Sequence, residues 1–245
     1  MKILVQFPTL ARQTKFLQCL SKYVNMASGL HEITFNINCD VDDPTMNNDE
    51  ARKNITDIFS HQYNTPNRAK ARVHYDAGTT KISAINDHIQ PDLYDIIICA
   101  SDDMIPQVEG WDDEIAKAMQ EHYPNLDGCV HFNDGYTDGK LITFSILGRE
   151  LYKHFGYIYH PDYKSLYCDN EFTQVVTGMD KLQYVDKVII KHEHYGEEGN
   201  TNSGDCDYSA KKTLYFSGRD GQVFEERKKL GFPTERITTD GGINI

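Results

Sequence analysis

The hydrophobic residues in the first half of the chain fall alternately into short continuous runs and into runs with helical spacing. Continuous apolar runs are typical of buried strands, and we expect such strands at 2–7 and 94–99, with further strands at 32–39 and 72–75, where apolar and polar residues alternate. Apolar spacings of three and four predict helices at 12–23, 49–59, 81–89 and 111–123. This alternation predicts an α/β fold with a mostly parallel central sheet flanked by helices.

The second half of the chain has a less regular pattern. Two strands are predicted around the turn Asn133-Asp134-Gly135, at 127–132 and 141–147, and a later strand at 185–191. Helices are predicted at 149–155 and from Asp169 onward, with a helical tail at 211–230 that is interrupted near Gly218 and Gly221. We expect one domain over 1–195, followed by a flexible loop and a helical tail, 196–245, packed on the same domain.

Composition and charge narrow the possible partners. The formal net charge is −12, and an acidic surface repels phosphate backbones and anionic lipids, so unaided DNA binding is disfavoured. No apolar run approaches the roughly 20 residues of a membrane span, and the first residues lack the pattern of a secretory signal. The six cysteines include no Cys-x-x-Cys pair, which favours reduced, structural thiols. We therefore expect a cytoplasmic protein.

Polar side chains gather where the predicted strands end. Thr9 and Arg12 follow the first strand, Asp40, Asp42 and Asp43 follow the second, and Ser101-Asp102-Asp103 follows the fourth. In parallel sheets, ligands bind outside the carboxyl ends of the strands. The sequence therefore predicts a ligand site at this edge of the sheet.

Two sets of residues could hold a metal ion. Asp102 and Asp103 place like charges close together, which calls for a cation such as a divalent metal shared with substrate phosphates. A solvated turn that caps the next helix is the alternative. His192 and His194 are two apart on the late strand and so point to one side of it. One of them either completes a metal site, in which imidazole favours manganese over magnesium, or both lie on the surface.

Two further groups carry candidate chemistry. Asp169 and Glu171 follow an aromatic-rich stretch, where partial burial suits a carboxylate to act as a general base. Asp169 also suits a helix N-cap, and both roles can hold at once. Lys81 and Asn86 lie on a predicted helix whose start suits a phosphate, although ordinary surface positions are the alternative. The chain has neither the Gly-x-Gly-x-x-Gly loop nor the Walker loop of other nucleotide-binding folds.

The order of these features resembles that of the GT-A glycosyltransferases, and of family 2-like enzymes in particular, over roughly residues 1–195. The stretches Ala-Ser-Asp-Asp-Met-Ile-Pro, Phe-Asn-Asp-Gly, Tyr-His-Pro-Asp-Tyr and Cys-Asp-Asn-Glu-Phe also resemble compact glycosyltransferases of phages and marine bacteria. The resemblance implies a GT-A-like catalytic domain built on a Rossmann-type sheet that binds a nucleotide-diphosphate-sugar.

The resemblance also implies which residues bind the donor and the metal. The donor-binding group combines the first loop, the acids after the second strand, the helix after the third strand and the Asp-x-Asp-like motif: Pro8, Thr9, Arg12, Asp40, Asp42, Lys81, Asn86, Ser101 and Asp102. Asp103 would bind Mn²⁺ or Mg²⁺ together with His192 or His194. Ser101 stands where the motif has its first acid.

The reaction implied by the resemblance is an inverting sugar transfer. Asp169 would be the catalytic base, with Glu171 as the second choice, and Cys168 stands where the family usually has a glutamate. The donor would be a nucleotide-diphosphate-sugar, a UDP-sugar first of all. The acceptor would be a glycan hydroxyl or, less in keeping with the net charge, a modified phage DNA base.

Two other functions remain open. A sugar nucleotidyltransferase would share the nucleotide-binding sheet, but such enzymes usually carry a glycine-rich basic loop after the first strand, and residues 8–14 contain no glycine. A non-catalytic module that binds nucleotide-sugars or metal would be consistent with the departures at Ser101 and Cys168. Hydrolysis of a donor separates this module from an enzyme.

Overall fold

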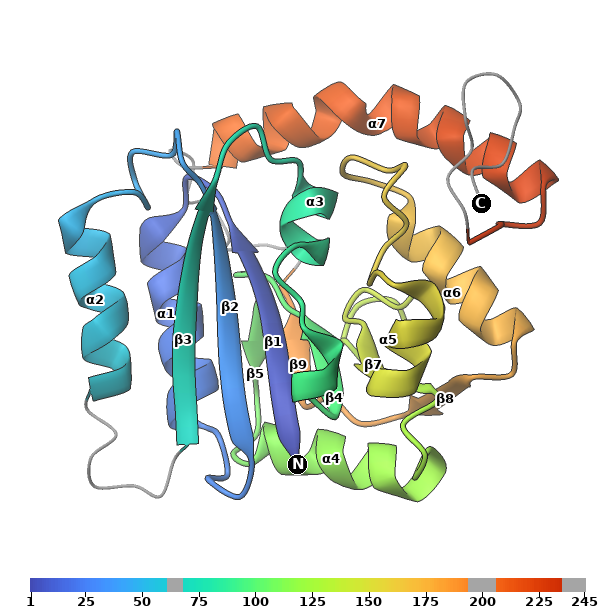
Figure 1. Ribbon diagram of the computed structural model, residues 1–245, viewed down its shortest axis with the longest axis horizontal. Coiled ribbons are helices and arrows are strands. Elements are labelled where there is room, and N and C mark those ends of the chain that lie inside the picture. Colours follow the sequence, from blue (N-terminus) through green and yellow to red (C-terminus); the bar gives the residue numbers. More distant parts are fainter. Residues whose placement is uncertain (61–67, 194–205, 235–245) are drawn as a thin grey trace.

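The computed structural model describes residues 1–60, 68–193 and 206–234. Its centre is a seven-stranded sheet with the strand order β3-β2-β1-β4-β7-β6-β8 (Figure 1). The strands are β1 (Lys2–Thr9), β2 (Glu32–Asp40), β3 (Arg68–Asp76), β4 (Ile96–Cys99), β6 (Cys129–Phe132), β7 (Ile146–Gly148) and β8 (Leu182–Val185). Strands β1 to β4 are parallel, and β7 is antiparallel to both of its neighbours. The prediction of a mostly parallel α/β sheet is confirmed.

Helices cover both faces of the sheet, because alternate residues of the apolar strands point to opposite faces. On one face, Val5 and Phe7 pack in a core with α1 (Gln13–Asn25), α2 (Asp49–Ser60) and α4 (Trp111–His122). On the other, Leu4 and Ile97 pack with α3 (Lys81–Asn86), α5 (Arg149–Phe155) and α6 (Cys168–Gly178). A short 3-10 helix, Pro91–Leu93, precedes β4. Each core is therefore sandwiched between the sheet and one layer of helices.

A separate two-stranded sheet forms beside the end of β4. Its strands are β5 (Met104–Pro106) and β9 (Ile190–His192), which pair antiparallel with Met104 opposite His192. The predicted single strand at 185–191 is wrong, because β8 ends at Val185 and the chain leaves the central sheet before β9 begins. Ile189 is fully buried, so core packing rather than strand pairing accounts for its apolar character.

The hairpin predicted around Asn133-Asp134-Gly135 is wrong in its second strand. Strands β6 and β7 do pair antiparallel, but 133–145 forms a loop and not a turn followed by a strand. The buried carboxylate of Asp134 accepts hydrogen bonds from the backbone N–H of Thr137 at 2.7 Å and from the hydroxyl of Thr143 at 2.7 Å. These bonds fold the loop back on itself, which an extended strand would prevent.

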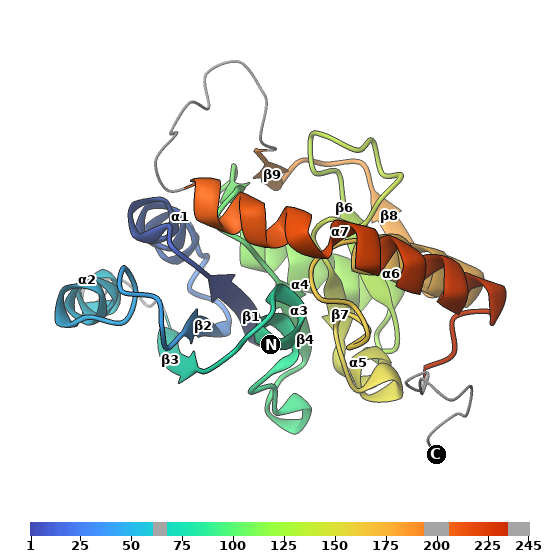
Figure 2. The same ribbon diagram turned by 90° about the horizontal axis from the view of Figure 1, so that it is seen from above.

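The last helix of the described chain, α7 (Cys206–Lys229), is continuous, so the predicted interruption near Gly218 and Gly221 is wrong. Its packing against the 162–171 segment compensates for the weak helix propensity of the two glycines. Figure 1 shows α7 along the edge at which β1, β2 and β3 end, and Figure 2 shows it crossing the molecule toward α6. Within the described ranges, none of the helices is both long and apolar enough to span a bilayer.

Candidate active site

The loops after β1 and β4 meet at the carboxyl edge of the sheet, because the two strands are parallel neighbours in register. Arg12 lies just before α1, and Asp102 lies two residues before β5. The guanidinium Nη2 of Arg12 is 2.9 Å from Oδ1 of Asp102. Two residues that the sequence separates widely are thus brought into an ion pair at the predicted edge.

The carboxylate of Asp102 is almost completely buried from solvent. Its side chain is 1% exposed, and burial raises its pKa to about 6, with Arg12 opposing the rise and Asp103 adding to it. Oδ1 of Asp102 has only the ion pair with Arg12, and among the described residues Oδ2 of Asp102, Nε of Arg12 and the hydroxyl of Thr9 have no hydrogen-bond partner. A buried polar group without a partner costs about 1–3 kcal/mol. Such groups therefore favour a polar ligand at this edge.

Asp103 is held by its own loop and by β9. The hydroxyl of Ser101 donates a hydrogen bond to Oδ1 of Asp103, and Nε2 of His192 lies 3.8 Å from the same oxygen. The backbone N–H of Glu193 donates to the carbonyl of Asp103 at 2.7 Å. Burial raises the pKa of Asp103, but His192 and Ser101 outweigh it and hold that pKa well below its usual range. The carboxylate is thus ionised and aimed at the histidine.

Asp103 and His192 have a spacing that fits a shared metal ion. With metal–ligand distances of about 2.1 Å, two ligands of one ion lie at most about 4.2 Å apart, and the observed separation is 3.8 Å. In the described part of the chain, no group of three or more His, Cys, Asp or Glu side chains could hold a metal. Further ligands would therefore come from substrate phosphates and water. The second candidate histidine, His194, lies outside the described residues.

The β1–α1 loop owes its shape to Asp43, which the donor-binding prediction omits. Asp43 is 3% exposed and accepts a hydrogen bond of 2.7 Å from the backbone N–H of Ala11. Ala11 has a φ of 55°, a left-handed conformation that costs energy in a residue other than glycine. The carboxylate of Asp43 stabilises this strained residue, and so fixes the direction in which Arg12 leaves the loop.

The other donor-binding candidates of the first two strands lie along the same edge. Asp40 ends β2 and accepts hydrogen bonds from the hydroxyl of Thr79 at 3.2 Å and from the backbone N–H of Asp42 at 3.1 Å. Asp42 is exposed, and Pro8 lies in β1 opposite Asn38. Their contact with a nucleotide stays a prediction.

Lys81 and Asn86 lie on α3 but have different surroundings. Asn86 donates to the carbonyl of Tyr159 at 2.6 Å and accepts from the backbone N–H groups of Ile158 and Tyr159 at 2.9 and 3.2 Å. Its amide is therefore engaged in holding the 158–159 backbone against α3. Lys81 is exposed at the first turn, so its ammonium group has the freedom to meet a ligand that Asn86 lacks.

The ends of β4, α3 and α6 converge electrostatically at Cys99. Burial raises the pKa of the Cys99 thiol to about 12, the charge of Lys81 lowers it, and the charge of Asp169 raises it. Because both charges act on one thiol at the end of β4, Lys81 and Asp169 face the same region. Their contact with a diphosphate and an acceptor hydroxyl stays a prediction.

The two carboxylates proposed as the base differ sharply. Oδ1 of Asp169 accepts a hydrogen bond from the adjacent backbone N–H of Asn170 at 2.9 Å, in the first turn of α6. Glu171 is buried, and Arg227 donates to both of its oxygens at 2.8 Å while the Tyr163 hydroxyl donates at 2.7 Å. A carboxylate saturated in this way is a poor proton acceptor, so the geometry disfavours the second choice, Glu171.

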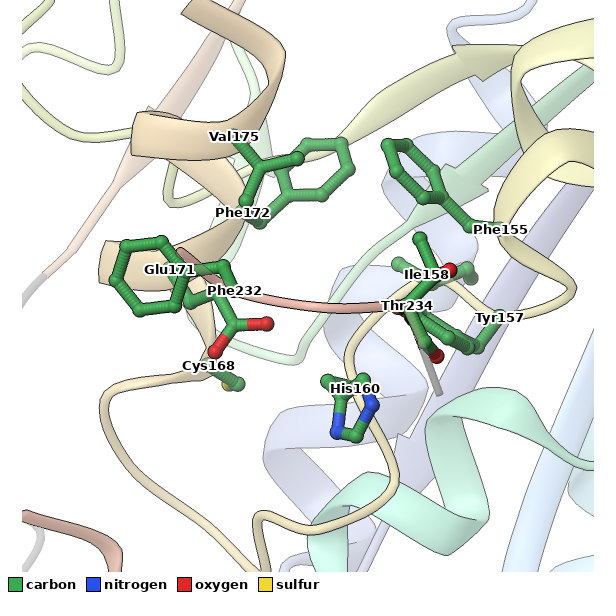
Figure 3. Close-up of a pocket in the computed structure, with 10 residues that line it drawn as sticks. All are labelled: Phe155, Tyr157, Ile158, His160, Cys168, Glu171, Phe172, Val175, Phe232 and Thr234. Carbon is green, nitrogen blue, oxygen red and sulfur yellow. Dashed lines mark hydrogen bonds between the residues drawn. The ribbon is translucent and has the colours of Figure 1, made fainter. Parts of the chain in front are cut away.

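A small pocket lies beside Glu171, between α6, the 155–160 segment and Phe232 (Figure 3). Its volume of about 20 Å³ is enough for about one water molecule. Figure 3 shows the imidazole of His160 and the carboxylate of Glu171 at this pocket, among aromatic side chains. It is too small for a nucleotide or a sugar, so the candidate active site is the edge of the sheet and not this pocket.

Solved structures of similar architecture assign the fold to one class, the GT-A fold. The mannosyltransferase PcManGT from Pyrobaculum calidifontis, solved with GDP-Man and Mn²⁺, matches with a TM-score of 0.56 and 10% identity over 80% of this chain. Glucosyl-3-phosphoglycerate synthase from Mycobacterium tuberculosis, solved with Mn²⁺, UDP and glucosyl-3-phosphoglycerate, matches with a TM-score of 0.55 and 11% identity over 95% of this chain and 81% of its own.

A third similar structure is TarS from S. aureus, with a TM-score of 0.52 and 13% identity over 79% of this chain. The chain spans 58% of the length of PcManGT and 37% of that of TarS. No protein-family model and no curated protein matches the sequence. At these identities the likeness establishes the GT-A fold, and the prediction of that fold is confirmed.

Proposed function

We propose that the protein is a metal-dependent glycosyltransferase that moves a sugar from a nucleoside-diphosphate donor to an acceptor hydroxyl. One observation carries the proposal: a buried strand delivers Asp102 and Asp103 to the carboxyl edge of a GT-A sheet, where Arg12 and His192 reach them from other elements. Buried like charges beside two cationic or metal-binding groups are arranged for a polyanionic substrate and its cation.

The donor would lie along this edge. The loop of Pro8, Thr9 and Arg12 and the acids Asp40 and Asp42 would surround the nucleoside, since all of them lie at or just beyond the ends of strands β1 and β2. The solved structures of similar fold contain UDP or GDP-Man, and we propose a UDP-sugar as the first donor to test. The donor's ribose and sugar would adjoin Ser101 and Asp102.

Asp103 and His192 would hold the divalent cation, Mn²⁺ or Mg²⁺, with diphosphate oxygens as further ligands. When bound, the cation neutralises the charge that develops on the departing diphosphate. Lys81, exposed at the start of α3, would add a second positive charge on the same leaving group. Imidazole favours manganese, so we expect Mn²⁺ to support binding better than Mg²⁺.

Asp169 would act as the general base in a single displacement with inversion. Its carboxylate would accept the proton of the acceptor hydroxyl while the hydroxyl oxygen attacks the anomeric carbon and the bond to the diphosphate breaks. A glycan hydroxyl is the acceptor that we propose. The net charge of −12 disfavours a DNA acceptor, because it repels the phosphate backbone.

A thermal-shift panel tests the donor site. Nucleoside diphosphates and their sugars are added with and without Mn²⁺ to the wild type and to Asp103→Ala, because a ligand that binds the folded state raises Tm. We expect a manganese-dependent rise in Tm with one base, which Asp103→Ala abolishes. No rise with any compound refutes the donor site. A rise without any release of diphosphate from the donor favours the non-catalytic module.

A further inference from the structure

One face of α7 packs against the 162–171 segment, which contains Asp169. Asp220, Gly221, Phe224 and Arg227 have the spacing of a single helical face, and each of them meets the 162–171 segment. The ring of Phe224 lies 5.8 Å from that of Tyr167, and the same ring lies beside Gly221, where a Cβ would be in ordinary contact with it at 3.5 Å. The contact is therefore continuous over two turns of the helix.

Asp220 fixes the backbone just before α6. It is fully buried and accepts hydrogen bonds from the backbone N–H groups of Lys164, Ser165 and Leu166, at 3.1, 2.7 and 3.0 Å. Successive N–H groups that converge on one point form an anion-binding concavity, and here the anion is a side chain of α7. The next residue, Tyr167, has a φ of 65°, which this clamp holds in place.

Arg227 fixes the first turn of α6 from the other side. It is fully buried, donates in a bidentate manner to Glu171 at 2.8 and 2.8 Å, and lies 3.3 Å from a carboxylate oxygen of Asp162. A bidentate pair sets orientation as well as distance, because two parallel bonds allow little rotation. Stable packing of two helices does not require such a pair, since apolar side chains of the same size stabilise a helix contact at least as well.

The two anchors bracket the base candidate. Asp220 holds the backbone up to Leu166, Arg227 holds Glu171, and Asp169 lies between these two points. We propose that Asp220 and Arg227 are positioning residues for Asp169, which set the distance between its carboxylate and the reacting hydroxyl. The inference rests on the proposed function. It makes the last helix part of the catalytic apparatus, although it contributes no group to the reaction.

The test is donor hydrolysis, in which water replaces the acceptor and Asp169 takes its proton. Asp220→Asn and Arg227→Lys are compared with the wild type, and Glu226→Gln, on the exposed side of α7, is the matched control. We expect kcat to fall about 10- to 100-fold in both variants, since a displacement near 1 Å can cost that much. The KM for the donor and the Kd for the nucleoside diphosphate should remain unchanged.

A double variant separates positioning from stability. Glu171→Met with Arg227→Met replaces the ion pair by apolar side chains, a change that often preserves folding, and we expect it to fold with a wild-type Kd and a reduced kcat. Folded variants with a wild-type kcat would overturn the positioning role and leave the proposed function intact. A wild type that neither binds a nucleoside diphosphate nor hydrolyses a donor overturns both.

Discussion

The carboxyl edge of the sheet and the contact between α6 and α7 both contain buried charges, but they treat them differently. At the helix contact, Glu171 is paired on both oxygens with Arg227, and Asp220 accepts hydrogen bonds from three backbone N–H groups. At the edge, Asp102 lies beside Asp103 and has a single ion-pair partner, Arg12, at 2.9 Å, and within the described ranges Oδ2 of Asp102 has no hydrogen-bond partner. The helix contact satisfies its charges fully from within the chain, whereas the edge satisfies them only in part and leaves acceptor capacity for a ligand.

This difference separates structural from functional carboxylates better than residue type does. A saturated buried carboxylate contributes to stability and is costly to expose to a substrate, because its partners would be stranded. A carboxylate that lacks partners lowers stability unless a ligand supplies them. Asp169 and Glu171, two residues apart on α6, differ in the same sense: Glu171 is saturated by Arg227 and Tyr163, whereas the half-buried Asp169 accepts one backbone hydrogen bond from Asn170.

The largest effect is expected at Asp169. Asp169→Asn removes the proposed base, so donor hydrolysis should fall about 10²- to 10⁴-fold, while Tm and nucleotide affinity stay at wild-type values. Asp180→Asn, an exposed position at the other end of α6, is the control and should retain full activity. An Asp169→Asn protein that hydrolyses the donor at the wild-type rate would place the base elsewhere.

The next effect is expected in stability, at Arg227. Arg227→Met strands Glu171 in the interior, and breaking a buried pair in this way costs about 3–5 kcal/mol. Urea unfolding measures the loss. Adding Glu171→Met should restore most of it, since the stranded charge is then gone. If the single and double variants are equally stable, the unpaired charge of Glu171 is not the cause of the stability loss in Arg227→Met.

A smaller effect distinguishes Lys81 from Asn86. Lys81→Ala removes an exposed charge, and we expect about tenfold weaker binding of nucleoside diphosphate with stability changed by less than about 0.5 kcal/mol. Asn86→Ala removes the hydrogen bonds to the 158–159 backbone, and we expect a loss of about 1–3 kcal/mol in stability. Weaker binding by Asn86→Ala at unchanged stability would instead make Asn86 a direct donor ligand.

The smallest effect concerns a buried group that neither region uses. His131 is fully buried, and burial holds its pKa below the ordinary value although the charge of Asp134 opposes this. The unfolded chain binds a proton near its ordinary pKa of about 6.5 and the folded chain does not, so stability falls as pH decreases below that value.

His131→Phe should remove this acid-side loss of stability between pH 7 and pH 5.5. Urea unfolding at the two pH values, on wild type and variant, measures it. Equal losses in both proteins would show that His131 is protonated in the folded state. The result would also test whether His131, a buried titratable group outside both regions, stays neutral in the folded state.

Much of the site could be predicted from the sequence because its residues follow strands. Asp102 and Asp103 come directly after the most apolar run, and Arg12 follows the first. Parallel strands bring their ends together, so local periodicity was enough to group these residues. The place of His192 beside Asp103 depends on β5 and β9, and no pattern of three residues predicts which strand it will join.

The positioning residues were beyond the sequence pattern. Asp220 and Arg227 are seven apart and share a helical face, which is a signal for a common partner but does not name it. The predicted break near Gly218 and Gly221 obscured even that signal. Glu171 and Asp169 look alike in sequence, and only the partner of each distinguishes them.

The sequence by itself determined the layers, the parallel sheet and the edge at which polar residues collect, because periodicity and the ends of apolar runs are local properties. The tertiary structure alone decided which buried charged residues of the chain find hydrogen-bond or ion-pair partners. Arg227 reaches Glu171 and Asp220 reaches the backbone before α6 across a long stretch of chain. Satisfaction of a buried charge depends on what packs against it in space, and that is set by the whole fold.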